Sequence, residues 1–159
     1  MSEPYEELLE GEACLRLPPG ARHEEICRRL HESVAASMAG VSVAKLLPLR
    51  SKIEISRFNH VCPDLALVTA AGNKLWLAAE VISSEDHSFD TVMKKGVYEQ
   101  FKLPRLWMID PRYNNVEIYH GNQYGLALKE ILAIREALTE PLLPSFQLPL
   151  ADLFKVSVP

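Results

Sequence analysis

The sequence predicts an α/β fold in which helices flank one central mixed β-sheet. The expected elements run in the order helix, several strands, second helix and further strands, which differs from regular strand–helix alternation. Two successive segments, residues 63–70 and 75–82, are apolar at nearly every position, which is typical of strands covered on both faces. With 159 residues and a hydrophobic fraction of 48%, the chain is expected to form a single domain over residues 1–159.

The helices and strands are expected from periodicity and from turn residues. Residues 3–12 are interpreted as a short helical lead-in, and residues 13–17 as a strand that ends at the Pro-Pro-Gly segment 18–20. Residues 21–39 carry apolar side chains at helical spacing. A second helix is expected over residues 90–102, and residues 143–154 are interpreted as irregular with at most a short final helix. The remaining strands are expected at residues 41–47, 51–58, 63–70, 75–82, 106–109, 114–120 and 123–130.

Composition narrows the class of protein. The formal net charge is −4 and the pI about 5.7, which argues mildly against a dedicated duplex-DNA binder, although a local basic patch can act alone. Three cysteines, Cys14, Cys27 and Cys62, without a Cys-x-x-Cys pair favour reduced core residues over disulfides or a zinc finger. No apolar run is long enough to span a bilayer, and the N-terminus is acidic, so a cytoplasmic location is expected.

Two carboxylates fall on strand faces that should be apolar. Asp64 opens the strand at 63–70, and Glu80 lies inside the strand at 75–82. A single acid near a strand end ordinarily reaches solvent or a salt bridge. Two acids at the ends of successive buried strands fit this ordinary explanation less well, because a buried carboxylate is costly unless it is paired or bound to a metal.

The two expected helices add polar residues on inward faces. At about 100° per residue, Asp90, Lys94 and Tyr98 share one face of the second helix, whereas Lys95 is rotated away from it. An Asp90–Lys94 pair could also be an ordinary i,i+4 ion pair of the helix without a functional role. In the first helix His23 falls within the apolar arc, where a histidine is more often a core residue than a ligand, so it is kept as a supporting candidate.

These side chains are sufficient for phosphodiester hydrolysis. Asp64 and Glu80, with a backbone carbonyl such as that of Val81, could hold Mg²⁺ or Mn²⁺, which prefer oxygen ligands. Such an ion makes a bound water a better nucleophile and neutralises phosphate charge. Lys94 could position that water or stabilise the transition state. The spacing alone is weakly specific.

The longer pattern resembles the Uma-two family of restriction-endonuclease-like proteins, which is similar to PD-(D/E)XK nucleases. The resemblance rests on ARHEEICRRL (21–30), PDLALV (63–68), AAEVIS (78–83) and the segment 90–111, in which Asp90, Lys94 and Tyr98 follow a D-x3-K-x3-Y spacing. It implies a restriction-endonuclease-like mixed sheet flanked by helices. In the usual E-x-K motif the lysine would stand at Ile82, so the resemblance implies that it has moved to Lys94 on the following helix.

The resemblance thus implies a Mg²⁺- or Mn²⁺-dependent endonuclease acting on nucleic acid, most simply DNA. Asp64 and Glu80 would be metal ligands, Lys94 the catalytic lysine, and His23, Asp90, Tyr98 and Lys95 supporting residues. Two alternatives stay open: a non-catalytic binding or assembly module with a nuclease fold, and a hydrolase of another phosphodiester. A homodimer is plausible, since cutting two strands favours two active sites. The scattered basic residues, Arg50 among them, are interpreted as solvated surface.

Overall fold

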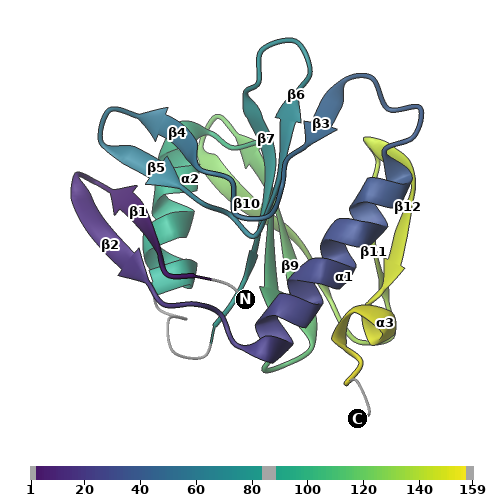
Figure 1. Cartoon of the computed structure of the whole chain (residues 1–159). Coiled ribbons are helices and arrows are strands. Elements are labelled where there is room, and N and C mark those ends of the chain that lie inside the picture. The colour runs from purple at the N-terminus through teal and green to yellow at the C-terminus, as the bar shows by residue number, and fades with distance from the viewer. Residues whose placement is uncertain (1–2, 84–88, 157–159) are drawn as a thin grey trace.

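A mixed six-stranded sheet forms the centre of the molecule (Figure 1). The computed structural model describes residues 3–83 and 89–156, with no side-chain description for residues 89–90. In the sheet only β7 and β8 run parallel, and every other neighbouring pair is antiparallel. The strand order is β10 (Gly125–Leu132), β9 (Asn115–Asn122), β8 (Arg105–Asp110), β7 (Leu75–Val81), β6 (Leu65–Thr69) and β3 (Ala44–Leu46).

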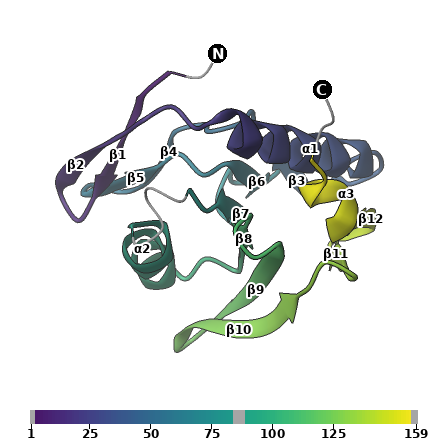
Figure 2. The same cartoon turned by 90° about the horizontal axis from the view of Figure 1, so that it is seen from below.

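One face of this sheet is covered by the long helix α1 (Ala21–Ser37) and by C-terminal elements (Figure 2). Ile26, Leu30 and Val34 of α1 are fully buried there, as the helical spacing predicted. The tail is more regular than expected, because it forms the hairpin β11 (Ala137–Glu140) and β12 (Leu143–Pro149) before helix α3 (Leu150–Phe154). Its alternating burial, with Phe146 and Leu148 facing the core, explains why.

The other face carries the second helical segment, a π-helical turn η1 (Phe89–Lys94) that continues as α2 (Lys95–Phe101). Val97 and Tyr98 of α2 pack on Ala78 and Met108 of the sheet. Because successive side chains of a strand point to opposite faces, Leu67 and Leu77 lie on the α1 side of the sheet, whereas Ala66 and Ala78 lie on the α2 side. The predicted α/β architecture with a central mixed sheet is therefore confirmed.

The N-terminal segment is a β-hairpin, and the expected helical lead-in is wrong. Strands β1 (Tyr5–Leu9) and β2 (Glu12–Arg16) pair antiparallel around Glu10 and Gly11, which both have positive φ, of 52° and 82°. A two-residue turn of this kind matches the natural twist of a hairpin. The hairpin joins β5 (Asn59–Val61) and β4 (Ile53–Ser56) in a second sheet, of order β2-β1-β5-β4, beside α2 (Figure 1).

No helix in the described part of the chain is long and apolar enough to cross a membrane.

Candidate active site

The predicted carboxylates and lysine meet where the C-terminal end of β7 lies beside the start of β6. Asp64 immediately precedes β6, Glu80 is the penultimate residue of β7, and Lys94 ends η1. All three side chains are buried, with exposed fractions of 5%, 3% and 1%. The inward position deduced for Lys94 is therefore correct, and the π-helical geometry of η1 is a feature often found at functional sites.

Glu80 is held by two side chains of the second helical segment. Lys94 Nζ donates to Glu80 Oε2 at 2.9 Å and also contacts Oε1. The Tyr98 hydroxyl donates to Glu80 Oε1 at 2.9 Å. Burial, followed by the negative charge of Glu80, raises the pKa of Tyr98, so this hydroxyl keeps its proton and acts as the donor. The spacing of Lys94 and Tyr98 by four residues thus places both on one carboxylate.

A third carboxylate, Glu7 of β1, completes this cluster, and the sequence interpretation missed it. Glu7 Oε2 lies 2.7 Å from Lys94 Nζ and accepts a hydrogen bond of 2.8 Å from the backbone N–H of Cys62. Arg16 Nε lies 3.8 Å from Glu7 Oε1. The alternation of Tyr5, Glu7 and Leu9 about the Glu-Gly turn was the available signal, and the helical interpretation of this segment concealed it.

Asp64 is fixed by the neighbouring strand and by α1. Its Oδ2 accepts a hydrogen bond of 2.8 Å from Val81 N and lies 3.6 Å from His23 Nε2, while Arg50 Nε lies 3.4 Å from Oδ1. Burial raises the pKa of Asp64, but the hydrogen bond and charge of His23, together with the charge of Lys94 and the N–H of Val81, leave this pKa below its usual value. Asp64 is therefore ionised at neutral pH. Arg50, expected at the solvated surface, instead lies at this carboxylate.

His23 orients the site from the first turns of α1. Its Nε2 lies 2.8 Å from the carbonyl oxygen of Val81, and its Nδ1 lies 3.5 Å from Cys27 Sγ. Burial lowers the pKa of His23, but the hydrogen bond and charge of Asp64, together with the hydrogen bond to the Val81 carbonyl, raise this pKa above its usual value. His23 thus contacts both Asp64 and the Val81 carbonyl, and its supporting role stays a prediction.

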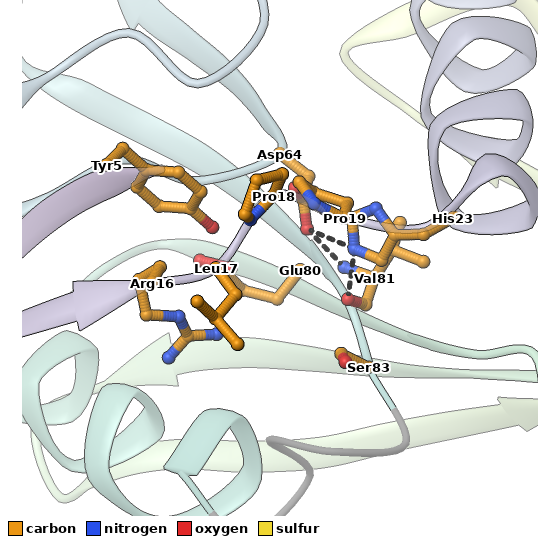
Figure 3. Close-up of a pocket in the computed structure, with 10 residues that line it drawn as sticks. All are labelled: Tyr5, Arg16, Leu17, Pro18, Pro19, His23, Asp64, Glu80, Val81 and Ser83. Carbon is orange, nitrogen blue, oxygen red and sulfur yellow. Dashed lines mark hydrogen bonds and ion pairs between the residues drawn. The ribbon is translucent and has the colours of Figure 1, made fainter. Parts of the chain in front are cut away.

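The carboxylates border a small pocket of about 60 Å³ (Figure 3). Asp64, Glu80 and Val81 line it, and Arg16 from the N-terminal hairpin lies on the opposite side of the pocket from His23 in the same view. Lys94 contacts Glu80 but is not one of the lining residues. The remaining lining residues are Tyr5, Leu17, Pro18, Pro19, His23 and Ser83.

The residues around this pocket fit a hard divalent cation. Asp64, Glu80 and the Val81 carbonyl present oxygen donors, which Mg²⁺ and Mn²⁺ prefer. Asp64 Oδ1 is buried and makes no hydrogen bond within the described residues; its contact there is the ion pair with Arg50 at 3.4 Å, which a metal would have to displace or share. Ligand atoms of His23, Cys27 and Asp64 also lie within 4.8 Å of one another. Burial raises the pKa of the Cys27 thiol, however, which disfavours the thiolate that a metal would require.

Two further predicted residues stand apart from the cluster. Lys95 is half-buried, and its Nζ lies 4.2 Å from the centroid of the Tyr119 ring, so it flanks the helix as its phase predicted. The side chain of Asp90 lies outside the described residues. Cys27 and Cys62 are buried and Cys14 is half-buried, and all three are free thiols.

Two comparisons with known proteins each match a description as a nuclease. A family model described as "Uma2: Putative restriction endonuclease" matches residues 2–151. Among solved structures, the chain is similar to one described as a putative nuclease belonging to DUF820 from Anabaena variabilis, with a TM-score of 0.78 and 16% identity over 96% of this chain and 91% of that one. At that identity the likeness shows the fold alone. A comparison with curated proteins found no match.

Proposed function

Because the chain belongs to the Uma2 family of restriction-endonuclease-like proteins, we propose that it is a divalent-metal-dependent endonuclease that hydrolyses phosphodiester bonds in DNA. The observation that carries this proposal is the convergence of Asp64 and Glu80 on one pocket, with Lys94 bound to Glu80. Asp64 and Glu80, together with the Val81 carbonyl, would hold Mg²⁺ or Mn²⁺. When bound, such an ion lowers the pKa of water and neutralises phosphate charge.

Two cations of the chain lie near this pocket, Arg16 on its wall and Lys94 behind Glu80, where they would counter the charge of a bound phosphate. Arg16 lines the pocket, is itself 7% exposed and has its Nε 3.8 Å from Glu7 Oε1, so its guanidinium places a fixed positive charge in the pocket wall that would attract phosphate oxygens. Lys94 is fixed between Glu80 and Glu7, which places a preorganised positive charge directly behind a pocket-lining carboxylate. Fixed charges of this kind stabilise negative charge that develops in a transition state.

The remaining contacts keep the acids ionised and correctly oriented. The Tyr98 hydroxyl donates a hydrogen bond to Glu80, while Val81 N and His23 bind Asp64. These bonds favour the charged form of each carboxylate, which a metal ligand requires. Tyr98 of α2 thus holds Glu80, and His23 of α1 holds Asp64. Each carboxylate is therefore oriented before substrate binds.

The test is cleavage of supercoiled plasmid and of single-stranded DNA with Mg²⁺ or Mn²⁺. The parent chain should cut either substrate only with a divalent metal, and Glu80→Gln, which keeps the side-chain shape, should lose both cutting and calorimetric Mn²⁺ binding. Glu54→Gln removes an exposed carboxylate of β4 and is the matched control. A Glu80→Gln variant that cuts and binds Mn²⁺ like the parent would disprove the assignment.

The same experiment distinguishes the proposed endonuclease from the main alternative, a non-catalytic binding module. A non-catalytic module is favoured by one observation, the ion pairing of Glu80 with Lys94, which a metal would have to compete with. If the parent binds Mn²⁺ but cuts no DNA, another phosphodiester becomes the better substrate. If the parent neither binds Mn²⁺ nor cuts, the lysine already occupies the cation position and the module is favoured.

A further inference from the structure

A second pocket adjoins the one bordered by the carboxylates. It has a volume of about 310 Å³ and shares His23 and Ser83 with the first pocket, so the two are neighbours. The guanidinium-bearing side chains of Arg22 and Arg112 line it. The first pocket, at about 60 Å³, has room for only a few atoms, since one water needs roughly 10–15 Å³. The rest of a polymeric substrate must therefore lie outside it, and the second pocket is the adjoining space.

Both arginines are held in place on one side. Arg112 Nε and Nη2 bind the Asp110 carboxylate at 3.0 and 2.8 Å, and Arg112 N binds Asp110 Oδ1 at 2.9 Å. Arg22 Nη2 donates to the carbonyl oxygen of Phe154 at 3.0 Å. These contacts engage only part of the five donors that each guanidinium carries. Tethered side chains lose less entropy on binding a ligand, so the pocket is preorganised for an anion.

We propose that Arg22 and Arg112 together bind one phosphate of the nucleic-acid strand, the phosphate next to the scissile one. This inference rests on the proposed endonuclease function. Phosphates follow one another along a strand, and the two pockets adjoin through His23 and Ser83. Arginine matches phosphate oxygens with paired donors. A chain with a net charge of −4 and buried carboxylates at its centre needs such local positive charge to attract a polyanion.

The test measures salt-dependent binding of a fluorescent single-stranded oligonucleotide by anisotropy, at fixed Mg²⁺, with every variant built on Glu80→Gln to prevent cleavage. Arg22→Gln and Arg112→Gln should each weaken binding several-fold. The double variant should lower the slope of log affinity against log salt by about 0.7, the value for one phosphate of a single strand. A value near twice that would mean two separate phosphates and would overturn the shared site.

The matched control is Arg28→Gln, also on α1, which removes the same charge. Arg28 is half-exposed and bonded to Glu25 and Glu32, so its loss should leave the slope unchanged. Arg112→Lys should retain most of the slope because it keeps the charge. If Arg112→Gln proves unstable in a thermal melt, Arg22→Gln carries the test, since its tether is a single bond to a backbone carbonyl.

The outcomes distinguish this inference from the proposed function. A parent chain that cleaves DNA, with arginine variants that match Arg28→Gln in affinity and slope, overturns the phosphate site alone. A parent chain that does not cleave, with Glu80→Gln that binds no oligonucleotide at any salt concentration, overturns both. In the parent background, a raised KM with unchanged kcat for Arg22→Gln would support a binding role rather than one in the chemical step.

Discussion

Glu7 Oε2 lies 2.7 Å from Lys94 Nζ, and neither side chain is more than 1% exposed. The first strand of the chain thus supplies a carboxylate that fixes a lysine on the second helical segment. Lys94 has a second carboxylate partner in Glu80. Because buried charges are stable only when paired, the three groups form one unit in which removal of any member alters the other two.

Glu7→Gln is expected to impair catalysis without abolishing metal binding. Glutamine can still accept the hydrogen bond from Cys62 N, but it no longer holds Lys94 by charge. We expect kcat to fall at least about tenfold, or 1.4 kcal/mol in barrier height, while KM and the Mn²⁺ isotherm change little. Glu6→Gln, an exposed neighbour on the same strand, is the control. Equal kinetics for the two variants would remove Glu7 from the site.

Lys94→Ala and Lys95→Ala should differ sharply. Lys94→Ala removes the charge bound to Glu80 and Glu7, so cleavage should be lost while Mn²⁺ still binds, since a competing cation has gone. Lys95→Ala removes only a half-exposed contact with the Tyr119 ring, worth about 0.5–1 kcal/mol. Steady-state cleavage assays on both variants check this. Comparable loss of activity would contradict the assignment of the lysine by helical face.

The inward residues of the site could be predicted because periodicity is a local property. Asp64, Glu80 and Lys94 were recognisable as charges on apolar faces, and their low exposure agrees with that reading. Arg50 was not recognisable, since nothing local distinguishes a loop arginine that reaches Asp64 from one that reaches solvent. Only the tertiary fold brings the loop after β3 to the carboxylate.

Glu7 was missed for a different reason. The segment EPYEELLEGE is rich in residues that favour helices, but pairing with β2 and β5 overrides this preference. Short strands such as β5 depend in the same way on neighbours that are distant in the sequence. The tail, interpreted as irregular, forms a two-stranded sheet, and Pro144 and Pro149 are compatible with β12 because they occupy exposed positions in it.

Asp64→Asn should lower the pKa of His23. In the parent chain Asp64 raises this pKa against the effect of burial, so removal of the charge should lower the pKa of His23. NMR titration of the imidazole resonance in metal-free protein measures the change. His120 provides a control in the same spectra, because burial and Arg105 already lower its pKa and neither involves Asp64. An unchanged His23 titration would show that the contact with Asp64 is absent in solution.

The same pair predicts how stability depends on pH. A pKa raised on folding means that the native state binds the proton more tightly than the unfolded state does. The contribution of His23 is therefore fully present below about pH 6.5 and is lost as pH rises through its folded-state pKa. Urea unfolding at several pH values should show this loss in the parent and less of it in His23→Gln. Identical pH profiles would contradict the coupling.

Gly121→Ala should destabilise the fold, whereas Gly96→Ala should not. A Cβ on Gly121 would lie 2.2 Å from the carbonyl oxygen of Leu103, in the backbone segment that follows α2, so the strand or that segment must shift. We expect a loss of about 1–3 kcal/mol. A Cβ on Gly96 meets nothing within 4 Å, and alanine in a helix gains about 0.5–1 kcal/mol over glycine. Urea unfolding measures both free energies. We expect opposite signs because Gly121 of β9 lies against backbone atoms, whereas Gly96 of α2 has open space beside it.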